Sequence, residues 1–105
     1  MKQPSITVAE VRDVASKIGI DWSDVAFSLD DLRVGMGVEL EHGLRDPQTD
    51  VTGNDLVMTG KIALAHLKEF PDYYQRLERM EREAEQYWVE RERAAHGEAG
   101  ERTGE

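Results

Sequence analysis

The sequence predicts an all-α fold: a compact bundle of about four helices that ends in a long C-terminal helix. Pairs of the Ser/Thr-x-x-Asp/Glu type, which cap the starts of helices, recur along the chain. Apolar residues follow these pairs at intervals of three and four, and no window alternates apolar and polar residues for long enough to indicate a β-strand. The length of 105 residues allows one domain of this kind.

The first helix is predicted from its two ends. Thr7 and Glu10 form a capping box at its start, and Gly19 can adopt the left-handed conformation that ends a helix. A short connector over residues 21–27 follows. We expect its two aromatic residues, Trp22 and Phe27, to fill the core.

The second and third helices are predicted from further capping pairs. Ser28 with Asp31 opens a helix that contains Gly35, where glycine costs about 1 kcal/mol relative to alanine. The usual compensation is the close approach of a neighbouring backbone, which we expect here. A loop over residues 45–51 follows. Thr52 with Asp55 then opens a third helix, which continues to about residue 70.

The final helix is long. Pro71 fits its first turn, where the missing N–H of proline has no partner to lose, and the helical pattern continues to about Ala95. Tyr87 and Trp88 lie far along it. Ordinary core residues are the simpler interpretation of this pair, whereas exposure of both rings would mark an interface.

The two ends of the chain are predicted to lie outside the folded domain. Residues 1–5 have no periodic pattern, and residues 97–105 contain no apolar side chain larger than alanine. Such a composition cannot offset the entropy of ordering the chain. We therefore expect a flexible start, a single helical domain over residues 6–96 and a disordered acidic tail. His96, next to this tail, receives no role.

The composition excludes several classes of function. The chain has 22 acidic and 13 basic residues and a formal charge of −9, which argues against direct binding to the nucleic-acid backbone. It has no cysteine, so disulfides, thiolate metal sites and cysteine nucleophiles are excluded. No apolar run approaches the roughly 20 residues of a membrane-spanning helix. We expect a small acidic intracellular domain that does not bind membranes.

Two glutamate–histidine pairs are the candidate metal ligands. Glu39 lies three residues before His42, and His66 lies three residues before Glu69. Residues three apart share one face of a helix, so each pair can present an imidazole and a carboxylate to one point. Two such pairs on different helices could supply an N₂O₂ site for zinc, iron or manganese. The simpler interpretation is a buried histidine that is hydrogen-bonded to glutamate, tyrosine or a backbone carbonyl.

A helical wheel places His66 near the middle of the apolar arc of the third helix and Glu69 inside its edge, so we expect both to point inward. Glu41 projects away from the apolar stripe of its own helix and is predicted to be solvated. Of Tyr73 and Tyr74, we expect one to pack and the other to hydrogen-bond toward His66 or Glu69. No nucleophile with an adjacent base and no phosphate-binding glycine motif is present, which argues against an enzyme.

Two segments carry a resemblance. VELEHG, residues 38–43, followed by KIALAHLKEFPDYY, residues 61–74, resembles a small uncharacterised family of phage and prophage domains with the signature E-H … A-x-x-H-L-x-E-x-P-x-Y-Y. The resemblance covers about residues 31–80. Members occur alone or attached to virion proteins, so it implies the cytoplasm of the host cell or the virion, and it supplies no reaction. The motif residues are Glu39, His42, His66, Glu69, Pro71, Tyr73 and Tyr74.

Three functions remain open from the sequence. The one we favour is a phage-type helical binding or structural module, which docks on a protein partner or on itself while its His/Glu cluster stabilises the fold. The second is a metal-binding protein, including a metal-dependent hydrolase, with a divalent cation as cofactor. The third is an acidic decoy that mimics nucleic acid, which the interspersed arginines of the final helix argue against.

Overall fold

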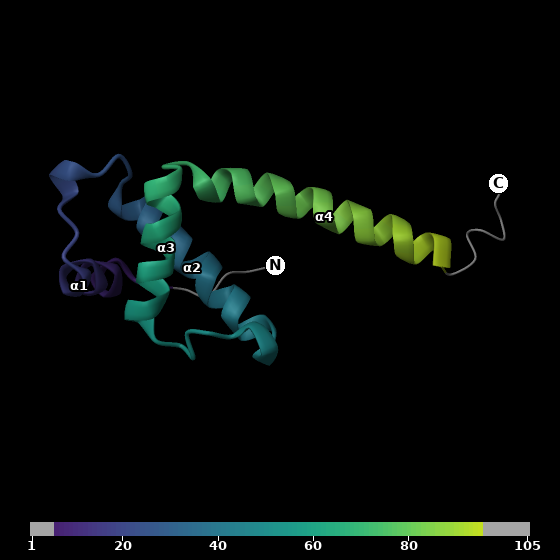
Figure 1. The fold of residues 1–105 in the computed structure, drawn as a ribbon, viewed down its shortest axis with the longest axis horizontal. Helices are drawn as coiled ribbons and strands as arrows, with labels where there is room; N and C mark the ends of the chain where they lie inside the picture. Colours follow the sequence, from purple (N-terminus) through teal and green to yellow (C-terminus); the bar gives the residue numbers. More distant parts are fainter. Residues whose placement is uncertain (1–5, 96–105) are drawn as a thin grey trace. The chain divides into compact units, whose positions relative to one another are not determined.

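The computed structural model describes residues 6–95 of the chain (Figure 1). Within this range the regular structure is entirely helical, which confirms the all-α prediction, the four helices and the long C-terminal helix. The α-helices are α1 (Val8–Ile18), α2 (Leu29–Arg45), α3 (Leu56–Glu69) and α4 (Tyr73–Ala95), with 3₁₀ turns η1 (Trp22–Asp24) and η2 (Pro47–Thr49). The predictions for residues 1–5, for His96 and for residues 97–105 lie outside the described residues.

The starts of α1 and α2 are set by local hydrogen bonds, as predicted. Thr7 Oγ1 accepts from the backbone N–H of Glu10 at 3.1 Å, and the Thr7 N–H donates to the Glu10 carboxylate at 2.9 Å. Ser28 and Asp31 form the same reciprocal pair at 3.1 and 2.9 Å. Each box satisfies two donors that the first turn leaves without helical partners.

The start of α3 differs from the prediction. Asp55, not Thr52, is the N-cap, because its Oδ1 accepts from two backbone N–H groups of the first turn at 2.9 and 3.1 Å. Residues 52–55 instead form a turn closed by the Asp55 N–H on the Thr52 carbonyl at 2.9 Å. Gly53 and Asn54 have φ values of 54° and 72°, a left-handed conformation that a right-handed helix cannot contain.

The start of α4 also lies later than predicted. Pro71 falls in the turn before the helix, which begins at Tyr73. The reason is Phe70, whose φ of −142° and ψ of 120° are extended, as is usual for a residue that precedes proline. The Tyr73 N–H donates to the Phe70 carbonyl at 3.0 Å and closes this turn.

The chain divides into two compact units, one that ends at Tyr74 and one that begins at Gln75. The first unit holds α1, α2, α3 and the first two residues of α4, and α2 packs most extensively against α3, which crosses it in Figure 1. The second unit contains the rest of α4. The single domain predicted over residues 6–96 stays a prediction.

The core of the first unit lies between its three helices. Its largest fully buried side chains are Val11, Leu32, Met36, Thr59 and Leu67. Gly60 allows α1 to approach α3 closely, because a Cβ there would lie 2.5 Å from a methyl group of Val14. Of the two connector aromatics, Phe27 is buried, but Trp22 is exposed, and the two rings meet edge to face with centroids 5.9 Å apart. The prediction that Trp22 fills the core was therefore wrong.

Over the described range, none of the helices combines the length and the apolar character that crossing a membrane requires.

Candidate functional site

Three side chains from three helices form what we call the His–Glu–Tyr cluster: Glu39 of α2, His66 of α3 and Tyr74 of α4. The Tyr74 hydroxyl donates to Glu39 Oε2 at 2.7 Å, and His66 Nδ1 lies 2.9 Å from the same oxygen and 3.1 Å from the hydroxyl oxygen. Since the single hydroxyl proton goes to Glu39, the hydroxyl can only accept from the imidazole. Nδ1 therefore carries a proton, and in the neutral ring Nε2 is the basic nitrogen.

The cluster is partly buried, which makes its hydrogen bonds necessary. The Glu39 side chain is 12% exposed and that of His66 31% exposed, while Tyr74 is buried. A carboxylate removed from water to this degree requires donors, because an unpaired buried charge costs several kcal/mol. The imidazole and the phenol supply them. The geometry is thus the hydrogen-bonded alternative that the sequence left open.

The neighbouring tyrosine, Tyr73, fixes the plane of the imidazole. Its ring stacks on that of His66 with centroids 4.2 Å apart and an interplanar angle of 4°. Tyr73 and Tyr74 meet edge to face at 5.0 Å and 74°. This confirms the expectation that one tyrosine packs while the other hydrogen-bonds toward His66.

Gly35 of α2 provides the space for Tyr74. A Cβ at residue 35 would lie 2.5 Å from Cε2 of the Tyr74 ring. The expected close neighbour at this glycine is therefore an aromatic side chain and not a backbone. The absence of a side chain at Gly35 lets the phenol reach Glu39, one turn further along the helix.

Tyr74 of the cluster and the neighbouring Tyr73 are both held in the neutral form. Burial raises the pKa of Tyr74 far above its usual range, and its hydrogen bond to the Glu39 carboxylate and the charge of that carboxylate raise it further. Burial also raises the pKa of Tyr73, with contributions from the charges of Glu39 and Glu69. Tyr74 is therefore a hydrogen-bond donor, and neither phenol acts as a base across the physiological range.

The four predicted metal ligands do not meet at one point. The structure joins Glu39 to His66, but Glu69 is exposed, so the expectation that it points inward was wrong. His42 is half-buried on α2. Across residues 6–95 no group of three or more His, Asp or Glu side chains is placed to hold a metal ion. An N₂O₂ site built from these four residues does not fit this geometry, because Glu69 is exposed and no three of the described His, Asp or Glu side chains converge.

Glu41 also differs from its prediction. Its side chain is 15% exposed, and within the described residues its Oε2 is buried without a hydrogen bond, although Arg45 Nη2 lies 3.6 Å away. The helical wheel failed because α2 is covered on more than one face. The buried residues of α2 are Leu32, Gly35, Met36, Gly37, Val38 and Gly43, which point in several directions around the helix.

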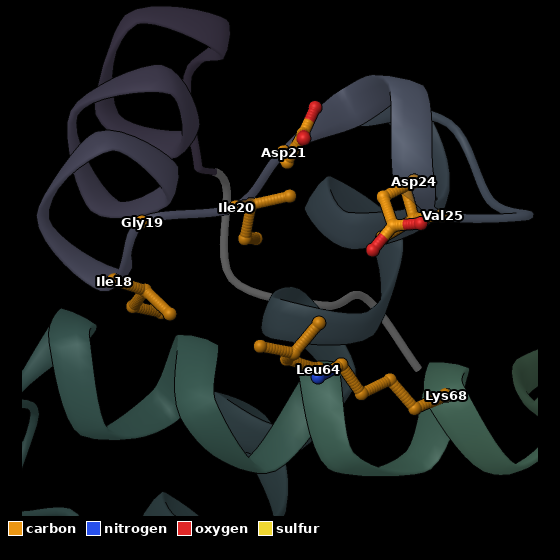
Figure 2. Close-up of a pocket in the computed structure, with 8 residues that line it drawn as sticks. All are labelled: Ile18, Gly19, Ile20, Asp21, Asp24, Val25, Leu64 and Lys68. Carbon is orange, nitrogen blue, oxygen red and sulfur yellow. The ribbon is translucent and has the colours of Figure 1, made fainter.

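A pocket of about 220 Å³ lies between the end of α1, η1 and α3 (Figure 2). Its lining residues are Ile18, Gly19, Ile20, Asp21, Asp24, Val25, Leu64 and Lys68. The Asp21 carboxylate is tied to its own turn, since it accepts from the Ser23 hydroxyl at 2.7 Å and from the Ser23 N–H at 3.0 Å, and these bonds lower its pKa. Sequence reasoning missed this pocket because its residues form no motif.

An exposed aromatic surface lies on the second unit. Tyr87 and Trp88 are 51% and 62% exposed, and their rings meet edge to face at 5.0 Å and 82°. The Arg91 guanidinium carbon lies 5.6 and 6.0 Å from the two ring centroids. We call these three residues the aromatic patch. Their exposure is the condition under which the sequence predicts an interface.

Comparison with known proteins identifies a family whose function is unknown. The family model described as "Protein of unknown function (DUF5661)" matches residues 11–83, which include α2, α3 and the first half of α4. The match contains every residue of the His–Glu–Tyr cluster and ends before the aromatic patch. No curated protein and no solved structure matches the chain significantly.

Proposed function

The chain belongs to the DUF5661 family of proteins of unknown function, and from its own surfaces we propose that it is a small helical protein-binding module. Its contact surface is the aromatic patch of α4. The signature that resembles phage and prophage domains supports the host cytoplasm or the virion as its setting. The His–Glu–Tyr cluster has a structural role in this proposal, since it joins the first residues of α4 to α2 and α3.

The exposure of Tyr87 and Trp88 is the observation that carries the proposal. Aromatic side chains bury about 150–250 Å² each when covered, and both rings leave about half of that area in water. At about 25 cal/mol per Å², covering them would contribute on the order of 5 kcal/mol. Tyrosine, tryptophan and arginine are also the residues most enriched in binding hot spots. Their adjacency on one helix therefore favours a docking surface.

The metal-binding alternative has less support. Zinc, iron or manganese would need Glu39, His42, His66 and Glu69 to converge, and Glu69 is exposed. A metal-dependent hydrolase would in addition need a substrate cleft beside the metal. The pocket of Figure 2 has Asp21, Asp24 and Lys68 as its charged lining residues, and none of the four predicted ligands lines it.

Site-specific photo-crosslinking tests the proposal. A benzophenone amino acid at Trp88, in cells that produce the protein naturally, should yield one discrete crosslinked protein. The matched control places it at Arg82, an exposed residue that the helical period puts opposite the centre of the aromatic patch. Crosslinking from Trp88 but not from Arg82 would support the proposal. No product, or equal products from both positions, would contradict it.

A further inference from the structure

A regular pattern of apolar residues extends along α4 on both sides of the aromatic patch. They alternate at intervals of three and four, the heptad pattern of helices that pair in left-handed coiled coils. We call this row the α4 seam: Leu77, Met80, Ala84, Tyr87, Arg91 and Ala94. Arg91 is its one charged member. At 1.5 Å per residue the seam is about 27 Å long.

The seam is open along most of its length. Tyr74 is the one buried residue of α4, and it precedes the seam. Met80 is 58% exposed and Tyr87 51% exposed, and Ala84 between them is also exposed. Helices in proteins gain most of their stability from packing an apolar face, so an open seam on a helix of this length offers that face to a partner.

The distribution of charge indicates what kind of partner fits. Residues 75–95 contain five arginines and six glutamates, so this part of α4 is close to neutral. Residues 1–74 contain 7 basic and 13 acidic residues. A basic partner would be attracted to the first unit, not to α4. An apolar seam with near-neutral flanks is complementary to another helix of the same kind, and the same chain supplies one.

We propose that two copies of this chain associate through their α4 seams as an antiparallel two-helix coiled coil. The inference rests on the proposed function, in that it names the partner of the α4 surface. A parallel pair would place Arg91 opposite a second Arg91 and bring two acidic first units to the same end. In the antiparallel pair the two Arg91 side chains are far apart, and the two acidic first units are no longer at the same end. In a register centred on residue 82 this pair also sets Met80 opposite Ala84 and Tyr87 opposite Leu77, so that larger side chains face smaller ones. The paired part of the seam then runs from Leu77 to Tyr87, and Arg91 lies beyond it.

Sedimentation velocity of the full chain, from low micromolar to several hundred micromolar concentration, tests the association. We expect a single two-helix contact to bury less than the roughly 1,200 Å² of stable interfaces, and the dimer to dissociate in the micromolar range. Met80→Glu should weaken it at least about tenfold. Val89→Glu is the matched control, because Val89 is 49% exposed but lies off the seam, and it should leave the dimer unchanged. Circular dichroism checks that both variants keep their helices.

Disulfide crosslinking tests the orientation, and the absence of cysteine makes each introduced thiol unique. When Met80→Cys and Ala84→Cys proteins are mixed and oxidised, the antiparallel pair predicts that the mixed disulfide exceeds both homodisulfides. A predominant Ala84→Cys homodisulfide would mean a parallel pair and would overturn the orientation. The species are resolved by mass.

Trp88 fluorescence separates failure of this inference from failure of the proposed function. Trp22→Phe leaves Trp88 as the single tryptophan. In the dimer its emission shifts to shorter wavelength as concentration rises. A monomer with solvated Trp88 at every concentration overturns the dimer but leaves the crosslinking test of the binding module standing. A monomer whose Trp88 is shielded at every concentration means that the chain covers its own patch, and both proposals fail.

Discussion

Two aromatic pairs on α4 have nearly the same internal geometry and opposite surroundings. Tyr73 and Tyr74 meet edge to face at 5.0 Å and 74°, and Tyr87 and Trp88 do so at 5.0 Å and 82°. The first pair contacts α3 and α2 through His66 and Glu39. In the second pair, the Arg91 guanidinium of the same helix lies over the rings, and about half of the area of both side chains is exposed to water.

The comparison shows that the tertiary partner, not the local sequence, determines what an aromatic pair does. The first pair has an acidic residue and a histidine to satisfy its polar groups, and it contributes to folding. The second pair leaves about half of its ring area exposed, and burial of that apolar area would favour association. Equivalent substitutions in the two pairs should therefore differ in their effect on folding.

The largest expected difference is between Tyr74→Ala and Tyr87→Ala. Truncation of the buried Tyr74 removes its packing against Gly35 and the donor to Glu39, and it should lower the free energy of unfolding by about 3–5 kcal/mol. The same substitution at Tyr87 should change it by less than about 0.5 kcal/mol below the dimerisation concentration. Urea denaturation followed by circular dichroism measures both. Similar losses at the two positions would contradict the division.

The next largest difference is expected between Glu39 and Glu69, each of which lies three residues from a histidine in the sequence. Glu39→Ala leaves the imidazole and the phenol without their shared acceptor, so we expect a loss of about 2–3 kcal/mol. Glu69→Ala removes an exposed carboxylate and should cost less than about 0.5 kcal/mol. Thermal denaturation compares them. Equal effects would mean that Glu69 has a role that its exposure does not indicate.

These glutamates show how far sequence reasoning reaches. The wheel correctly indicated that His66 lies at a partly covered position, because the helical period fixes direction. It failed for Glu69 and Glu41 because the period does not say which neighbour covers a given face. Side chains at the edge of an apolar arc are therefore the ones whose exposure depends on tertiary packing.

The helix boundaries give the same lesson. The boxes at Thr7 and Ser28 were predictable because their partners lie three residues away. At Thr52 the same spacing occurs, but Gly53 and the following asparagine adopt a left-handed turn, and Asp55 becomes the cap. A spacing rule could not choose between these two local solutions. The pocket beside η1 could not be predicted from the sequence for another reason. It forms only when α3 packs against the end of α1.

A smaller effect is expected at alkaline pH. The pKa of Tyr74 is raised in the folded state, whereas in the unfolded chain it is about 10. The resulting stabilisation is complete below pH 10 and is lost as pH rises further, because the unfolded chain then releases a proton that the folded chain keeps. The slope above pH 10 should be about 1 kcal/mol per pH unit. Tyr74→Phe should remove most of this slope, measured by urea denaturation between pH 9 and 11; an unchanged slope would show that Tyr74 titrates normally.

The smallest expected effect is that of a chelator. It tests whether the order of the first aromatic pair, Tyr73 and Tyr74, depends on a bound metal. If a divalent metal bound Glu39 and His66, the order around Tyr73 and Tyr74 would be due to that ion and not to hydrogen bonds. A structural metal contributes on the order of 10 kcal/mol, so its removal could not escape detection. We expect the Tm of untagged protein to be the same with and without chelator, and elemental analysis to find less than one metal per chain. A stoichiometric metal whose removal lowers the Tm would mean that Glu69 and His42 move inward on binding. In that case the first pair, like the second, would depend on a partner from outside the chain.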